Sequence, residues 1–300
     1  MRIGFALPQF HRQAFEVARV AEFAREVEQA GAASLWVGDR NLAAVRPRVG
    51  YGGQGTTIPP ELNPAADPFV LLGVAAAATE RVLLGSHVLI APLYPPVQLA
   101  RALTTIDLIS GGRLLAGFGI GWSPEEYEAA GRNFSRRGAL LDELLDALQA
   151  IWTEDPAGYS GSLLSVPRHH APLKPARLPR PPVFLGALSE RALRRVARRA
   201  DGWLPLCVVP DYVDVDGLAA QRALLDEWAR DAGREPGDIG TVLRVNVSTG
   251  TDARTVAEAI RSVHAATGID HFMVDTMYEA ETVEESSSYA RELLALLPPE

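Results

Sequence analysis

The segment RVLLGSHVLIAPLYPPVQLARALTTIDLISGGRLLAGFGIGW, residues 81–122, carries two strand-like runs around one helix-like run. Arg81–Ile90 is apolar and partly β-branched, which predicts a buried strand. Pro96–Ser110 has proline in its first turn, as helices favour, and Arg113–Gly121 returns to a strand pattern. A strand, a helix and a strand in this order predict two parallel strands joined by a helical crossover.

The same alternation continues toward both ends of the chain. Further strands are expected at Arg2–Pro8, Ser34–Val37, Pro182–Gly186, Gly202–Leu206, Val242–Ser248 and His271–Asp275. Further helices are expected at about Phe15–Ala30, Asp67–Thr79, Ser135–Trp152, Ser189–Arg199, Asp211–Ala232, Ala253–Thr267 and Glu281–Leu297. Eight strand–helix units that end in a helix predict an α/β protein with a closed (β/α)8 TIM barrel, and a doubly wound open sheet is the alternative.

The whole chain, residues 1–300, is expected to form a single barrel domain. Two long segments interrupt the alternation, 41–66 and about 153–181, and both are rich in turn residues. Long loops inside a compact domain are commonly lids or binding loops, so we expect these two segments to matter for function.

Composition and charge exclude several classes of protein. The net charge of −8 and the pI near 5.4 argue against a nucleic-acid surface and against a polybasic membrane patch. No secretory signal and no run of 18 uncharged apolar residues is visible, so we expect a cytoplasmic location and no membrane partner. Cys207 is the single cysteine and Lys174 the single lysine, which disfavours an internal disulfide and Schiff-base catalysis. His169 and His170 lack spaced partners, so no metal site is expected.

Candidate site residues follow from the barrel itself, because active sites of barrels form at the carboxyl ends of the strands. Four strand ends supply them: Asp39 and Arg40; His87 and Val88; Gly119, Gly121 and Trp122; Gly186, Ala187, Leu188 and Ser189. A histidine in such a position can donate or accept a proton near neutral pH, although a buried histidine is often only hydrogen-bonded.

The alternating glycines Gly117, Gly119 and Gly121 lie on one face of their strand. They do not form a G-x-G-x-x-G loop, because Trp122 occupies the third place. A face without side chains lets a flat ring or another backbone approach closely, and for Gly117 tight packing is the preferred reading. Next, Ser123 to Glu126 predicts a helix start with a capping box.

The turn from Gly186 to Ser189 is a better candidate for a phosphate-binding site than the glycine row. A strand runs into the turn, and a helix begins near Ser189, so free backbone N–H groups point toward the strand end. Five arginines follow on this helix and are expected to lie mostly on a solvated face: Arg191, Arg194, Arg195, Arg198 and Arg199.

Four segments together resemble the luciferase-like flavin and deazaflavin oxidoreductases of the bacterial luciferase superfamily. They are SLWVGDR (34–40), residues 81–122, FSRRGALLDELLDALQAIW (134–152) and PPVFLGALSERALRRVARRADGW (181–203). Within the superfamily the chain is most similar to enzymes that use coenzyme F420. The resemblance implies a TIM barrel with the tricyclic cofactor across the end of the third strand, beside a cis peptide at His87–Val88. It also implies a variable region over the pocket at about 153–181.

The resemblance implies that Asp39 lies in the cofactor pocket and that Gly186–Ser189 binds phosphate. The implied activity is hydride transfer between the deazaflavin C5 and a small organic substrate, with His87 as first choice of proton donor and Arg40 binding an anionic or carbonyl group. Many F420 relatives have histidine where this chain has Arg40. An FMN-dependent monooxygenase and a non-catalytic F420-binding protein are the alternatives. Relatives are often dimers, which implies a homodimer.

Overall fold

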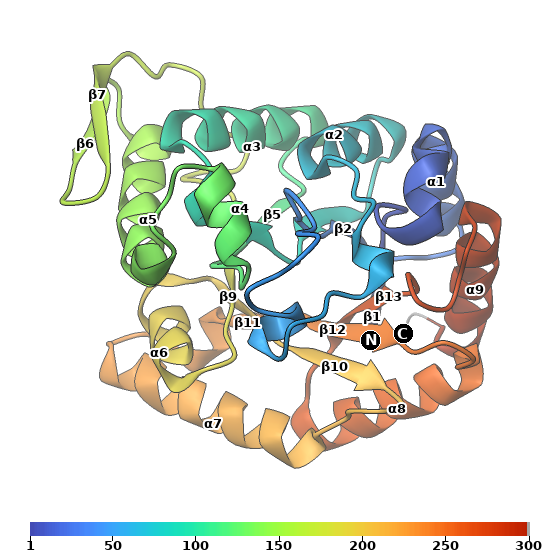
Figure 1. Cartoon of the computed structure of the whole chain (residues 1–300). Helices are drawn as coiled ribbons and strands as arrows, with labels where there is room; N and C mark the ends of the chain where they lie inside the picture. The colour runs from blue at the N-terminus through green and yellow to red at the C-terminus, as the bar shows by residue number, and fades with distance from the viewer. Residues whose placement is uncertain (299–300) are drawn as a thin grey trace.

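The computed structural model describes residues 1–298 and consists of alternating strands and helices (Figure 1). The strands are β1 (Arg2–Ala6), β2 (Ser34–Val37), β3 (Leu83–Ser86), β4 (Leu89–Ile90), β5 (Leu114–Gly119), β6 (Ala157–Ser160), β7 (Ser165–His169), β8 (Val183–Gly186), β9 (Gly202–Leu204), β10 (Leu206–Val209), β11 (Gly240–Thr241), β12 (Leu243–Val247) and β13 (His271–Asp275). The helices are α1 (Val20–Gln29), α2 (Pro68–Ala78), α3 (Pro96–Ser110), α4 (Pro124–Ala129), α5 (Arg137–Thr153), α6 (Glu190–Arg199), α7 (Val215–Asp231), α8 (Ala253–Thr267) and α9 (Val283–Leu296). Short 3-10 turns include η1 (His11–Arg19), η2 (Tyr51–Gly53) and η3 (Pro60–Leu62).

The strands pair in parallel in the order β12–β13–β1–β2–β3–β5–β8–β9. Only Pro205 separates β9 from β10, and only Val242 separates β11 from β12. Because β9 pairs with β11 and β10 with β12, the last members of the row also lie side by side. The fold is therefore a curled parallel α/β sheet ringed by helices, with the TIM-barrel-like form that the sequence predicts (Figure 1).

Side chains from the inner face of the sheet fill its interior. The ring of Trp36 is fully buried there, in a cluster with Leu115, Phe184 and Met273. Gly85 faces Trp36 across the β2–β3 register, and a Cβ on Gly85 would lie 2.2 Å from that ring. The outer face packs against the helices in one large apolar cluster, whose burial is the main stabilising contribution. None of the helices within residues 1–298 is long and apolar enough to cross a membrane.

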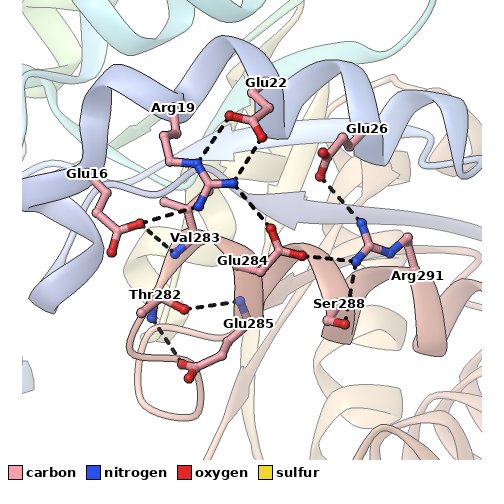
Figure 2. A network of polar contacts seen from close by, with 10 residues as sticks. All are labelled: Glu16, Arg19, Glu22, Glu26, Thr282, Val283, Glu284, Glu285, Ser288 and Arg291. Carbon is pink, nitrogen blue, oxygen red and sulfur yellow. Dashed lines mark hydrogen bonds and ion pairs between the residues drawn. The ribbon is translucent and has the colours of Figure 1, made fainter.

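The first and last helical units are joined by a surface network of charges (Figure 2). Arg19 pairs with Glu22 on α1 and reaches Glu284 on α9, while Arg291 of α9 contacts Glu26 of α1. These ion pairs are largely exposed, and each contributes at most about 1 kcal/mol. They reinforce the junction that the parallel pairing of β1 with β13 forms beneath them.

The segment between α5 and β8 does not lie where the resemblance placed it. Strands β6 and β7 form an antiparallel hairpin on the outside of α5, where the Glu143 carboxylate accepts hydrogen bonds from the backbone of Ser162, Leu163 and Leu164 (Figure 1). Its last part, 177–182, lines a cavity of about 480 Å³ together with His271 at the amino ends of the strands. The expected position over the carboxyl face is wrong, because α5 has already returned the chain to the amino ends.

The segment that does cross the carboxyl face is the β2–α2 loop, residues 38–67 (Figure 1). Its end is fastened by Gln9, whose amide donates a hydrogen bond to the Ala66 carbonyl. Leu62 of η3 packs in a small buried cluster with Phe10 and Met277. The loop is thus anchored to the segments that follow β1 and β13.

Candidate active site

Two of the predicted strand ends meet at the carboxyl side of the sheet. Asp39 and Arg40 follow β2 after Gly38, and His87 and Val88 separate β3 from β4. The His87–Val88 peptide is cis, as the resemblance implied. The Val88 side chain packs against the interior cluster around Trp36.

Asp39 is held by two donors on the chain that follows β3. Its Oδ2 accepts hydrogen bonds from the backbone N–H of Ile90 (2.8 Å) and from the Tyr94 hydroxyl (2.9 Å). Its Oδ1 is buried and has no hydrogen-bond partner among residues 1–298. Burial raises the pKa of Asp39 to about 7, against the two hydrogen bonds, which favour the charged form. The carboxyl group can therefore gain or lose a proton near neutral pH.

Arg40 lies beside Asp39 with its side chain only 4% exposed. Its guanidinium stacks 4.6 Å from the centre of the Trp122 ring, and Nη1 lies 3.8 Å from Oε2 of Glu126. Nε and Nη2 are buried and make no hydrogen bond to any residue that the structure describes. Burial lowers the pKa of Arg40 and raises the pKa of Glu126. The arrangement leaves two strong N–H donors free for an acceptor.

His87 is turned into the barrel instead. His87 is only 5% exposed, and its ring packs edge to face on Trp36, with 6.4 Å between the ring centres. Nε2 lies 3.2 Å from the carbonyl oxygen of Pro205, while Arg244 donates a hydrogen bond to the His87 carbonyl. Burial, with a further effect of Arg244, lowers the pKa of His87 to about 3. The imidazole is thus neutral at neutral pH.

The alternating glycines make room for the neighbouring strand. A Cβ on Gly117 would lie 1.7 Å from the carbonyl oxygen of Ser86, so tight backbone packing explains this position. A Cβ on Gly119 would lie 2.5 Å from Cγ2 of Val88, and one on Gly186 would lie 3.3 Å from its Cγ1. Glycine at these positions therefore accommodates the segment that contains the cis peptide.

Gly121 and Trp122 lead from β5 toward α4. Gly121 has a φ of +62°, a conformation that favours glycine, and a Cβ there would lie 2.8 Å from Ile90. Trp122 then lies against Arg40, as described above. The row of glycines therefore ends next to Trp122, whose side chain contacts Arg40 of the predicted site.

The predicted phosphate turn has the expected local structure. Gly186 ends β8, and the Ser189 hydroxyl accepts a hydrogen bond from the backbone N–H of Ala192 in the first turn of α6. Ala187 is buried, whereas Leu188 is 75% exposed. The amino end of a ten-residue helix is thus accessible beside the strand end.

The arginines of α6 divide into two groups. Arg195 and Arg199 pair with acidic residues of α5, and Arg194 lies over the Trp228 ring at 3.9 Å. Arg191 and Arg198 are exposed and have no ion-pair partner within residues 1–298. Of these two, Arg191 lies in the first turn, next to the predicted phosphate turn.

Sequence reasoning missed Tyr94 and misassigned Glu126. Ser123 is the N-cap of α4 and Pro124 follows it, but Ser123 makes no capping hydrogen bond, so the predicted capping box is wrong. The Glu126 carboxylate instead accepts from the backbone N–H of Asn41 and faces Arg40. A buried acid partner for Arg40 could have been expected from its strand-end position, but no spacing rule identifies which acid supplies it.

The sequence profile of the luciferase-like monooxygenase family matches residues 1–295, so the chain belongs to this family of oxidoreductases. An uncharacterised protein of Mycobacterium tuberculosis is 37% identical over 170 residues, 56% of this chain and 58% of that protein. The phthiodiolone/phenolphthiodiolone dimycocerosates ketoreductase of the same organism is 32% identical over 240 residues, 78% of this chain and 61% of the ketoreductase. The chain thus spans only about three fifths of the length of these relatives.

Solved structures show the same fold. Monooxygenase RslO1 of Streptomyces bottropensis has a TM-score of 0.79 at 19% identity, with 99% of each chain covered. An F420-dependent secondary alcohol dehydrogenase with a bound F420–acetone adduct has a TM-score of 0.76 at 16% identity and the same coverage. The oxygenating constituent of 3,6-diketocamphane monooxygenase from Pseudomonas putida, bound to FMN, has a TM-score of 0.73 at 14% identity, covering 100% of this chain and 97% of that one. One of these solved structures thus holds an F420 adduct and another holds FMN.

Proposed function

We propose that the protein is an F420-dependent oxidoreductase that moves a hydride between C5 of the deazaflavin and a small organic substrate, with a C=C, C=N or alcohol/carbonyl group. One observation carries the proposal: at the carboxyl ends of the strands, Arg40 and Asp39 keep three buried polar atoms that have no partner in the described part of the chain. Buried donors and acceptors are normally satisfied, so unsatisfied ones in this position favour a ligand.

The unpartnered atoms fit the edge of a flavin-type ring. The pyrimidine-dione edge of a flavin or deazaflavin offers carbonyl oxygens and one ring N–H, which complement the N–H groups of Arg40 and Oδ1 of Asp39. The remaining residues proposed for the cofactor site are His87, Val88, Gly119, Gly121 and Trp122 for the ring, and Gly186, Ala187, Leu188 and Ser189 for the phosphate. When bound, the deazaflavin supplies the hydride chemistry.

The chain's own residues then divide the remaining work. Asp39 holds or releases a proton at Oδ1, because its pKa of about 7 allows both states near neutral pH. Arg40 has two free donor atoms, Nε and Nη2, and through them it orients a carbonyl group of the cofactor edge and a carbonyl or anionic group of the substrate. We assign the proton to Asp39 in place of His87, because the His87 imidazole is neutral and turned toward Pro205. His87, which forms the cis peptide with Val88, is then a positioning residue.

The printed names of the neighbours support an oxidoreductase but also support the first alternative. The FMN-bound neighbour favours an FMN-dependent monooxygenase on the same barrel, which would require a yellow protein that consumes oxygen with reduced flavin. A non-catalytic F420 carrier would bind the cofactor tightly and turn over no member of a panel of enones, imines and alcohols. Fluorescence titration with F420 and FMN, followed by this panel, separates the three proposals.

We also propose a homodimer built on helices α2 and α3. These neighbouring helices expose a group of apolar side chains: Val70, Val74, Val97, Leu108 and Ile109. Groups of exposed apolar side chains on neighbouring helices commonly belong to protein interfaces. A second copy of the chain would cover them.

A further inference from the structure

Two contacts hold the β2–α2 loop on α4: Glu126 binds the start of the loop through the backbone N–H of Asn41, and the exposed Arg48 binds its middle. Arg48 donates hydrogen bonds to Oε1 of Glu125 through its backbone N–H (2.8 Å) and its Nε (3.0 Å), and its Nη2 lies 2.7 Å from Oε2 of Glu128. The Arg48 side chain is 57% exposed; its partner Glu128 is 75% exposed, and its partner Glu125 is 17% exposed. Because Arg48 lies in solvent, salt screens its ion pairs, and their release leaves the apolar core in place.

The tip of the loop places Tyr51 over the site. Gly50 and Gly55 close the tip through a backbone hydrogen bond, and Tyr51 N–H donates to the Thr57 carbonyl (2.9 Å). The Tyr51 ring meets Trp122 edge to face at 5.7 Å, on the tryptophan that also stacks with Arg40. The Tyr51 hydroxyl also lies close to that of Tyr278, which follows β13, and contributes to the raised pKa of Tyr278.

In the closed position, the loop blocks the access of a ligand to the free donors of Arg40 beneath it. The unpartnered atoms of Arg40 are fully covered by protein, so no ligand reaches them in this arrangement. We propose that residues 41–58 form a lid that opens by releasing Arg48 from α4, and that Tyr51 is a ligand-contacting residue which the lid returns to the Trp122–Arg40 pair. The identity of the ligand, F420, rests on the proposed function, but the opening of the lid does not.

The lid movement has a direct optical reporter. Of the five tryptophans, Trp36, Trp152, Trp203 and Trp228 are buried, and Trp122 beneath Tyr51 is the one that is partly exposed. Acrylamide quenching of the ligand-free protein therefore reports mainly on Trp122. Arg48→Ala is expected to raise the quenching constant at least twofold, and 0.5 M NaCl should do the same to the wild type. Adding Trp122→Phe to the variant should abolish the increase.

The matched control is Arg2→Ala, which breaks a similarly exposed pair with Asp270 at the opposite end of the barrel. It should leave the quenching unchanged. With F420 as probe, Arg48→Ala should speed both association and dissociation several-fold, while Tyr51→Ala should mainly speed dissociation. An acrylamide quenching constant for Arg48→Ala that is no greater than the constant for Arg2→Ala would overturn the lid proposal. If quenching rises but F420 does not bind, the lid stands and the cofactor assignment fails; F420 kinetics unaltered by Tyr51→Ala would remove Tyr51 from the site.

Discussion

The Tyr94 hydroxyl donates a 2.9 Å hydrogen bond to Oδ2 of Asp39, and this contact links the chain after β4 to the end of β2. The bond favours the charged carboxylate, whereas burial favours the neutral acid and is the larger effect. Asp39 therefore stays protonated in the folded state up to about pH 7, while an unfolded aspartate ionises near pH 4.

The sign of the resulting pH dependence follows from proton binding. Between about pH 4 and pH 7 the folded state holds a proton that the unfolded state has lost, so the Asp39 contribution to the free energy of unfolding falls as pH rises and levels off above pH 7. Asp39→Asn removes this term. The stability of Asp39→Asn relative to wild type should be more favourable at pH 8 than at pH 5 by about 2 to 3 kcal/mol, measured by urea unfolding. Equal differences at both pH values would show that the Asp39 pKa is ordinary.

Tyr94→Phe removes a donor from the Asp39 carboxylate while keeping the ring that packs on Phe69. The pKa of Asp39 should then rise further, and the levelling of the stability curve should move to higher pH by about one pH unit. Urea unfolding from pH 5 to pH 9 measures this. A curve that coincides with wild type would mean that the hydrogen bond does not act on Asp39.

The glycine row gives a prediction about packing. Gly117→Ala places a Cβ 1.7 Å from the Ser86 carbonyl oxygen, which only a backbone shift can relieve, so the variant should lose about 3 kcal/mol or more of stability, or fail to fold. Gly73→Ala is the matched control, because Gly73 lies in α2 and a Cβ there meets no atom within 4 Å. That variant should gain about 0.5 to 1 kcal/mol from helix propensity. Similar thermal midpoints for the two variants would refute the packing account.

Phosphate binding at the Gly186–Ser189 turn predicts an effect of Arg191. Arg191→Ala should weaken F420 binding about tenfold, roughly 1.4 kcal/mol, and should leave binding of the deazaflavin without its phosphate unchanged. Arg198→Ala is the control, because Arg198 is equally free but lies in the last turn of α6. Equal losses in the two variants would indicate general electrostatics in place of a phosphate contact.

The proposed dimer can be tested with a charge on α2. Val74→Glu should shift the protein from dimer to monomer in light scattering after size exclusion, because it places a carboxylate within the apolar group of α2 and α3. Leu173→Glu changes an exposed apolar residue of the α5–β8 segment and should leave the mass unchanged. A wild-type protein that is monomeric at all concentrations would end the proposal.

Periodicity predicted the eight strand–helix units, because a buried strand and an amphipathic helix each imprint a period on the local sequence. Because periodicity also locates the end of β2, the rule that barrel sites form at the carboxyl ends of strands selects Asp39 and Arg40 as candidate site residues. Contacts from distant segments left no such imprint. The local spacing predicts Glu126 as a cap for α4, and only the fold shows that it faces Arg40. The prediction that the α5–β8 segment lies over the carboxyl face was wrong. It followed from the resemblance, whereas α5 returns the chain to the amino ends of the strands before this segment begins.

The most direct test of the central claim is a fluorescence titration of the purified protein with F420 and, in parallel, with FMN. The proposed function predicts saturable F420 binding at micromolar concentration or tighter, weakened by Arg40→Ala, with FMN bound at least tenfold more weakly. Micromolar FMN binding together with indifference to F420 would contradict it and assign the site to a flavin monooxygenase.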